Sequence, residues 1–209
     1  GLQYDLNKTD YRINPRKGFE ITTIASAGTK KLKKNNTIAD FKDPSDPGFD
    51  FGNLYDTVKL RTYQFRLQAT IAKYSPVGRQ STIKTSVNTG IFQSGNIFRN
   101  ELFQLGGYKT LRGFDEESQY LTQFAFATLE YRLFVSQNSY FNVFTDGGWG
   151  KNKTNVTNLS YTYISTGLGL AIDAKAGIFN LAAAVGKRND DPGFNLRKVK
   201  IHIGFVSYF

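Results

Sequence analysis

Three charged residues stand out because their types and positions allow strong mutual contacts. Arg112 carries a planar guanidinium with five N–H donors, while Glu130 and Asp146 carry carboxylates that accept such donors. Both acids fall on the polar side of segments in which polar and apolar residues alternate. An arginine from a long loop could therefore reach both from one side. We predict a loop that charge-assisted hydrogen bonds pin against a wall.

Other side chains give weaker indications of chemistry. His202 is the only histidine and the chain has no cysteine, so it cannot by itself assemble a catalytic triad or a metal cluster based on His and Cys. Residues 147–151 (Gly-Gly-Trp-Gly-Lys) lack the spacing of a phosphate-binding loop. The acids at 115–117 are most simply a solvated loop flank, with cation binding as the alternative. We expect no catalytic residue, no metal site and no cofactor.

The net charge of +10 comes from 27 basic and 17 acidic residues. Such a balance can indicate nucleic acid or anionic lipid as a partner, but charges scattered over loops and a wet inner surface explain it more simply. We expect no nucleic-acid partner. The lysines at 30, 31, 33 and 34 are most simply part of a solvated loop, and binding of lipopolysaccharide phosphates is the alternative.

The elements that would position these residues are β-strands, because the dominant period is two. In residues 63–74 the odd positions are mainly apolar and the even ones mainly polar. No run approaches the roughly 18 apolar residues of a membrane-spanning helix, whereas about 9 to 11 alternating residues suffice for a tilted membrane strand. We predict nine strands, at residues 2–12, 18–28, 63–74, 81–91, 122–135, 140–149, 163–172, 178–187 and 198–209.

The predicted connections alternate in length, and all five prolines fall within them. Short ones are expected at 14–17, 75–79, 136–138 and 173–177. Long ones are expected at 29–58, 93–121, 150–162 and 188–197. Short periplasmic turns and long extracellular loops are typical of bacterial outer-membrane barrels, which nearly always have an even number of strands. Nine strands therefore predict a part of a larger barrel.

Several motifs resemble the Omp85 superfamily, whose members insert or export other proteins. Residues 105–114 (Leu-Gly-Gly-Tyr-Lys-Thr-Leu-Arg-Gly-Phe) are similar to the signature of the family's long sixth extracellular loop. Residues 129–132 (Leu-Glu-Tyr-Arg) and 143–148 (Val-Phe-Thr-Asp-Gly-Gly) resemble the family's next two strands. Residues 10–18 resemble its turn of Asn-Pro and Gly. The resemblance covers nearly the whole chain.

The resemblance implies roles for particular residues. The functional loop would comprise Gly106, Gly107, Arg112, Gly113 and Phe114, and its partners on the inner wall would be Glu130 and Asp146. Gly113 would allow a tight backbone path and Phe114 would provide an apolar anchor.

The C-terminal residues resemble the signal by which barrel proteins are recognised for assembly. This signal would include Gly204, Phe205 and the terminal Phe209. Ser207 departs from the pattern, because an aromatic residue is usual at its position, so the terminal Phe remains the main support.

We therefore expect an all-β, transmembrane antiparallel β-barrel in the bacterial outer membrane. Residues 1–209 would supply about nine C-terminal strands of a 16-stranded barrel, with residues 93–121 folding inward. The resemblance implies assembly, insertion or translocation of polypeptides, with residues 198–209 along a weak strand seam. Expected partners are client polypeptides, the remaining strands, outer-membrane lipid including lipopolysaccharide, and accessory assembly proteins.

Two alternatives come from other functional classes. A passive porin or structural barrel would show the same alternation, but it would not require the Arg-Gly-Phe loop and two inward acids. An enzyme is the second alternative, if a hydrolase domain precedes the barrel in the full protein.

Overall fold

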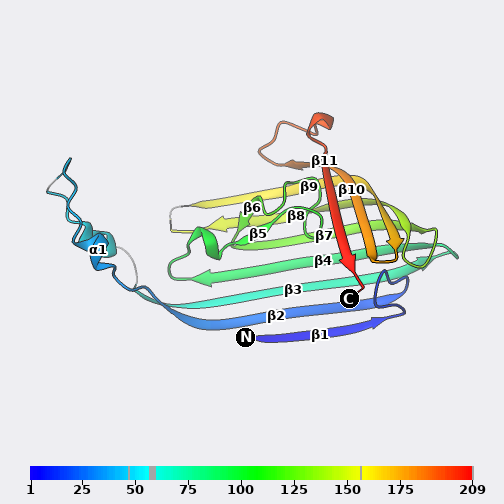
Figure 1. Ribbon diagram of the computed structural model, residues 1–209, viewed down its shortest axis with the longest axis horizontal. Helices are drawn as coiled ribbons and strands as arrows, with labels where there is room; N and C mark the ends of the chain where they lie inside the picture. Colours follow the sequence, from blue (N-terminus) through cyan, green and yellow to red (C-terminus); the bar gives the residue numbers. More distant parts are fainter. Residues whose placement is uncertain (47, 57–59, 156, 209) are drawn as a thin grey trace.

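The chain forms one large antiparallel sheet of nine strands, and the computed structural model describes residues 1–46, 48–56, 60–155 and 157–208. Each strand pairs with the next one along the sheet, as Figure 1 shows. The strands of the sheet are β1 (Leu2–Thr9), β2 (Gly18–Lys31), β3 (Arg61–Val77), β4 (Ser81–Ser94), β7 (Gln123–Phe134), β8 (Tyr140–Lys153), β9 (Asn158–Ala174), β10 (Gly177–Arg188) and β11 (Lys200–Ser207). The predicted all-β antiparallel architecture is confirmed.

The remaining elements are short and belong to the long connections. A two-stranded ribbon of β5 (Phe103–Leu105) and β6 (Gln119–Leu121) lies within the connection between β4 and β7. Among the residues described, the helices are α1 (Asn36–Ala39) and three 3-10 turns at Phe51–Tyr55, Arg99–Glu101 and Leu196–Lys198. None of the helices described has the length and apolar character needed to cross a lipid bilayer.

The sheet is curved, and its convex face carries the apolar side chains. Along β7 the outward residues are exposed, while most of the inward ones are buried. In a water-soluble protein a sheet buries its apolar face, so the arrangement here is the reverse of the usual one. Large apolar residues more than 40% exposed lie on many strands, including Tyr63, Ile71, Val87, Leu129, Val143, Leu168, Phe179 and Ile203.

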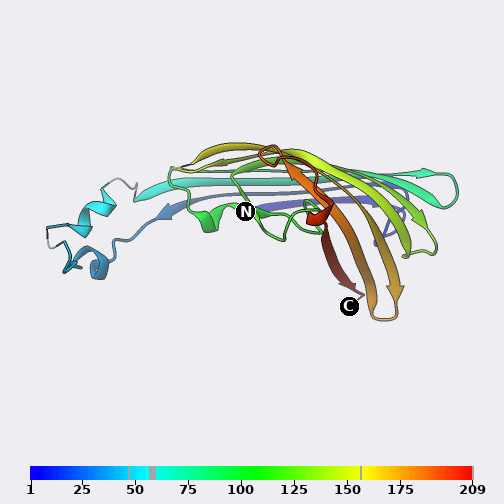
Figure 2. The ribbon, with the colours of Figure 1, turned by 90° about the horizontal axis from the view of Figure 1, so that it is seen from above.

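The concave face is covered by the connection of residues 95–122, which Figure 2 shows on the inner side of the curve. Apolar side chains of this loop pack against inward rings of the sheet. This cluster contains Phe92, Phe103, Leu105, Leu111, Phe114, Leu121, Phe124, Phe126 and Tyr163. Buried polar groups lie on the same face, among them Arg112, Glu130, Asp146 and His202. The loop therefore provides the inner face with a core of its own.

The two ends of the sheet are open among the described strands. β1 pairs only with β2, and β11 pairs only with β10. β11 is also short, and its partners in β10 are confined to residues 177–184. Each outer edge therefore presents backbone groups that the strands described do not pair.

Two sequence predictions about connections were wrong. The connection predicted at residues 150–162 is shorter than expected, because β8 continues to Lys153 and β9 begins at Asn158. Pro76 lies inside β3 rather than in a turn. β2 pairs with β3 only as far as Tyr74, so Pro76 has a strand on one side only, where a missing N–H is tolerated.

Candidate functional site

The centre of the candidate site is the side chain of Arg112, which joins two neighbouring strands. Its Nε and Nη2 donate to the two carboxylate oxygens of Asp146 at 2.8 and 2.7 Å. Its Nη1 donates to Oε2 of Glu130 at 2.6 Å. The backbone N–H of Arg112 also donates to Asp146, at 3.2 Å. The structure thus brings together the three charged residues singled out from the sequence.

This ion cluster is buried. The side chains of Arg112, Glu130 and Asp146 are 8%, 4% and 2% exposed. Burial by itself would lower the pKa of Arg112, but the hydrogen bonds and charges of the two carboxylates outweigh it and hold the pKa above its ordinary value. The guanidinium also lies 3.4 Å from the centre of the Phe144 ring. The arginine therefore remains charged and held on several sides.

The wall that receives Arg112 is built from β7 and β8. Thr128 pairs with Asp146 and Glu130 pairs with Phe144, so the two acids sit on adjacent strands, two residues apart in register. Both side chains turn to the concave face because inward and outward positions alternate along a strand. The period-two pattern of the sequence was sufficient to place them there.

A second arginine completes the cluster and was missed in the sequence analysis. Arg132 Nε donates to Oε1 of Glu130 at 2.7 Å, and its guanidinium faces the ring of Tyr140 at 4.8 Å. It stands two residues after Glu130 and therefore on the same face of β7. That spacing was the signal from which it could have been found. Glu130 thus bridges two buried arginines.

A tight turn built on two glycines presents Arg112. Gly106 and Gly107 have φ values of +115° and +88°, which L side chains rarely adopt. The Gly107 N–H donates to the carbonyls of Leu111 and Phe114 at 3.1 and 3.2 Å. A Cβ at Gly107 would lie 1.5 Å from the Glu116 carboxylate. The turn therefore depends on glycine for both conformation and space.

Gly113 and Phe114 continue the contact toward β9 and β10. Gly113 has a φ of +85°, and a Cβ there would lie 2.7 Å from the backbone nitrogen of Gly186 in β10. Phe114 is buried and makes an edge contact with the Tyr163 ring at 5.5 Å. The loop backbone thus lies directly against the wall at this point.

The predicted C-terminal signal residues are separated from the ion cluster. Phe205 lies on the outer face of β11, with its ring 4.7 Å from that of Phe179. Gly204 lies on the inner face, where a Cβ would be 3.5 Å from the Tyr108 ring. Phe209 lies outside the described residues. The structure shows no part of an assembly signal as such.

His202 connects the edge strand β11 to the loop, a contact that the sequence analysis did not predict. It is buried, and its Nε2 accepts the backbone N–H of Gly113 at 3.0 Å. This contact joins β11 to the loop across a long stretch of sequence. His202 lies on the inner face because side chains alternate along β11, but the approach of Gly113 depends on the curvature of the sheet, which the sequence pattern does not give.

Several charged loop residues that were considered for ligand binding contact other groups of the chain instead. Lys30 Nζ donates to the Glu101 carboxylate at 2.7 Å, and the Lys34 ammonium faces the Tyr55 ring. Asp115 pairs with Lys200 at 2.8 Å, and Glu116 accepts the Tyr108 N–H. In the part of the chain that the structure describes, His, Asp and Glu form no group suited to holding a metal ion.

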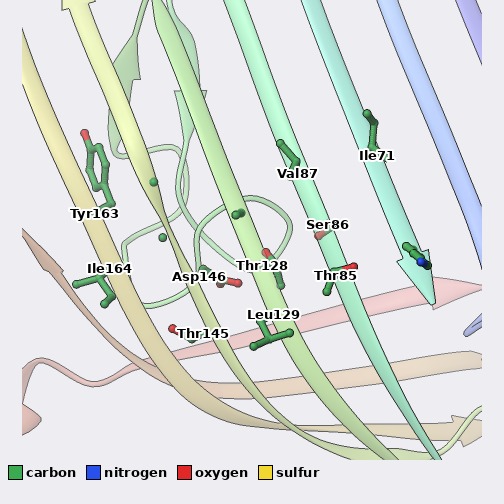
Figure 3. Close-up of a pocket in the computed structure, with 14 residues that line it drawn as sticks. Ile71, Thr85, Ser86, Val87, Thr128, Leu129, Thr145, Asp146, Tyr163 and Ile164 are labelled. Atoms are coloured by element: carbon green, nitrogen blue, oxygen red, sulfur yellow. The ribbon is translucent and has the colours of Figure 1, made fainter. Parts of the chain in front are cut away.

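A shallow hollow of about 680 Å³ lies on the convex face, opposite the loop. Figure 3 shows its apolar walls, which include Ile71, Val87, Leu129 and Ile164. Residues with small side chains, such as Ala127 and Gly147, pair at its floor. Asp146 of the ion cluster also lines this hollow, whereas Arg112 does not.

Comparison with protein-family models matches residues 1–205 to the Omp85 superfamily domain. A search of curated proteins found no match for the chain. Members of the Omp85 family are bacterial outer-membrane proteins with a general role in protein insertion or secretion. The match covers nearly the whole chain, including the loop and both strands that hold the ion cluster. This chain therefore belongs to the Omp85 superfamily.

Proposed function

We propose that this chain lies in the bacterial outer membrane as part of a transmembrane β-barrel that inserts or translocates other polypeptides. The observation that carries the proposal is the apolar convex face, on which Val87, Leu129 and Val143 are 46%, 51% and 52% exposed. Leaving such side chains in water forfeits about 25 cal/mol for each Å² of apolar surface that lipid would cover. A hydrocarbon environment removes this cost. The family membership supports the same location.

The open edges support a mechanism based on strand pairing. Further strands would close the sheet into a barrel, for which we propose 16 strands in all. β11 would form one side of a weak seam, where backbone N–H and C=O groups can template an incoming strand of a client. The shortness of β11 supports this assignment, because fewer ladder hydrogen bonds hold it than hold β9 or β10.

The loop would keep the inner face ordered while client strands pair with β11 at the seam. Arg112 is fixed by two carboxylates, and Phe114 is fixed in the apolar cluster beneath the loop. An anchored loop leaves the inner volume with a defined shape at the level of β7 and β8. No covalent step is required, so we propose neither a catalytic residue nor a cofactor.

The proposed partners follow from the surfaces. The apolar convex face would contact membrane lipid. Lys31 and Lys33 are exposed at the end of β2 and suit the phosphates of lipopolysaccharide. Client polypeptides and the remaining strands would meet the chain at its edges, and accessory assembly proteins complete the set. Nucleic acid is not among the proposed partners.

The test is site-specific photo-crosslinking in the full-length protein, reconstituted in lipid vesicles and supplied with an unfolded barrel client. A photoreactive residue replaces Ile203 on β11, which is 77% exposed. The matched control replaces Ile172 on β9, which is also on the convex face but has a strand on each side. We expect crosslinks to the client from position 203 and a background level from position 172.

A passive porin gives the opposite result. Its vesicles would conduct ions without a client, and crosslinks to the client would be equally rare at both positions. That outcome would overturn the proposed function, whatever the arrangement of the loop.

A further inference from the structure

The loop does not only bind the wall that carries Glu130 and Asp146, because it also reaches the edge strand. We propose that residues 106–115 act as an internal latch, which fastens β11 to β7 and β8 across the concave face. β9 and β10 lie between these two attachment points in the sheet. The loop and the edge strand would then move as one unit.

The first contact with β11 is the hydrogen bond from the Gly113 N–H to Nε2 of His202. Both residues are buried at this point, so an unmet donor or acceptor there would be costly. The contact is possible because Gly113 lies directly against the backbone of Gly186. A side chain at either glycine would hold the loop away from the wall.

Two further contacts reach β11 on either side of His202. Lys200 Nζ pairs with the Asp115 carboxylate at 2.8 Å. The Tyr108 ring lies over Gly204, where only hydrogen occupies the Cβ position. These three residues of β11 alternate along the strand and share its inner face. The latch therefore spans the first half of β11, from its first residue to Gly204.

The other end of the latch is firm. Arg112 makes three side-chain hydrogen bonds to β7 and β8, and its side chain is 8% exposed. β11, in contrast, has one strand neighbour among those described. The loop therefore gives this strand a second attachment that the sheet does not provide.

A functional consequence follows if the proposed function holds. Pairing of a client strand at the outer edge of β11 would pull on the latch. β11 cannot move away from β10 without either moving Gly113 or breaking the hydrogen bond between Gly113 and His202. The cluster around Arg112 would then set how readily the seam opens.

Hydrogen–deuterium exchange of the full-length protein in lipid nanodiscs tests the latch without any client. The variants are His202→Ala, Lys200→Ala and Arg112→Ala. We expect amide exchange in β11 to rise about tenfold in His202→Ala, a factor in line with the loss of one buried hydrogen bond. Lys200→Ala should produce a smaller rise, because a partly exposed ion pair contributes less.

Arg112→Ala gives the decisive result, because the hydrogen bonds and the ring contact described for Arg112 are made to β7 and β8 rather than to β11. Faster exchange in β11 of this variant supports the latch. Unchanged exchange in β11 of both Arg112→Ala and His202→Ala overturns it. His202→Gln, which keeps an acceptor, should restore part of the protection, and Ile201→Ala on the outer face serves as the control.

Closing the latch covalently separates this proposal from the proposed function. The chain has no native cysteine, so Asp115→Cys with Lys200→Cys introduces the only thiols of the chain for a cleavable bismaleimide. Crosslinking should slow exchange in β11, and cleavage should reverse the change. Slower exchange together with undisturbed client insertion would support the latch but overturn the role of β11 at the seam. Exchange that the crosslink leaves unaltered would overturn the latch.

Discussion

Two long connections of similar length behave in opposite ways. Residues 95–122 fold onto the concave face, whereas the described residues of the connection between β2 and β3 (32–46, 48–56 and 60) project beyond the end of the sheet, as Figures 1 and 2 both show. In the first loop Leu111 and Arg112 are 0% and 7% exposed. In the second, Phe41 and Phe49 are 52% and 45% exposed.

Aromatic residues do not account for this difference, because both loops contain them. In the projecting loop, Phe51 makes edge contacts with the rings of Phe41 and Phe49, so these rings pack mainly on one another. The inserted loop adds an arginine for which the wall supplies two carboxylates. A loop is thus drawn onto the wall when its charged groups, as well as its apolar ones, have partners there. Changes to the two loops and to the wall test this explanation.

Replacing Arg112 by Ala should have the largest effect, because it removes the charged group that attaches the inserted loop, residues 95–122, to the wall. It would leave Asp146 buried without Arg112 and leave Glu130 paired with Arg132 alone, and breaking a buried ion pair typically costs about 3–5 kcal/mol. Urea unfolding of the full-length protein in lipid vesicles would measure the loss. The control is Lys34→Ala in the projecting loop, for which a change within about 0.5 kcal/mol is expected. Equal losses in the two variants would contradict the explanation.

Asp146→Asn should have the next largest effect, because Asp146 accepts three of the four hydrogen bonds that Arg112 makes. An amide accepts fewer such bonds and carries no charge, so we expect a loss of about 2–3 kcal/mol. The double variant with Arg112→Ala should lose clearly less than the sum of the single losses. Simple additivity in this cycle would show that the two side chains act independently.

Gly113→Ala should have an intermediate effect through the backbone alone. The residue has a left-handed φ, and its Cβ would lie 2.7 Å from the Gly186 nitrogen, so a loss of about 1–3 kcal/mol is expected. Gly193→Ala is the matched control, since a Cβ there meets nothing within 4 Å. Thermal unfolding, followed by the gel mobility of unheated samples, would rank the two variants.

Replacing residues 36–56 by a short Gly/Ser linker should have the smallest effect. The hydrogen bonds that the structure gives these residues are made within the projecting loop, such as that from the Asn35 N–H to the Tyr55 hydroxyl. Loop length contributes only weakly to stability, so the unfolding free energy should change by less than about 1 kcal/mol. A larger loss would mean that this loop also supports the wall.

The fold was predictable where the physical signal was local. Alternation of polar and apolar residues placed all nine strands of the sheet, because successive side chains along a strand point to opposite faces. It failed between β8 and β9, where Gly150 and Asn152 suggested a loop but continue the ladder. The ribbon of β5 and β6 was missed because strands of three residues show no periodicity.

The site was predictable in part for the same reason. The alternation of side chains along β7 and β8 predicted that Glu130 and Asp146 share one face. The same alternation places Arg132 on that face, so its contact with Glu130 could also have been predicted. The contact between Gly113 and His202 was beyond such reasoning. It depends on how far the sheet curves between β8 and β11, which is a property of the assembled sheet and of no single segment.

The inserted loop is tied to the sheet on both sides. Near its start, Glu101 binds Lys30 of β2 and its carbonyl accepts a hydrogen bond from Arg66 of β3, while near its end Gly113 reaches β11. A segment that joins opposite flanks of a curved wall limits how far these can spread.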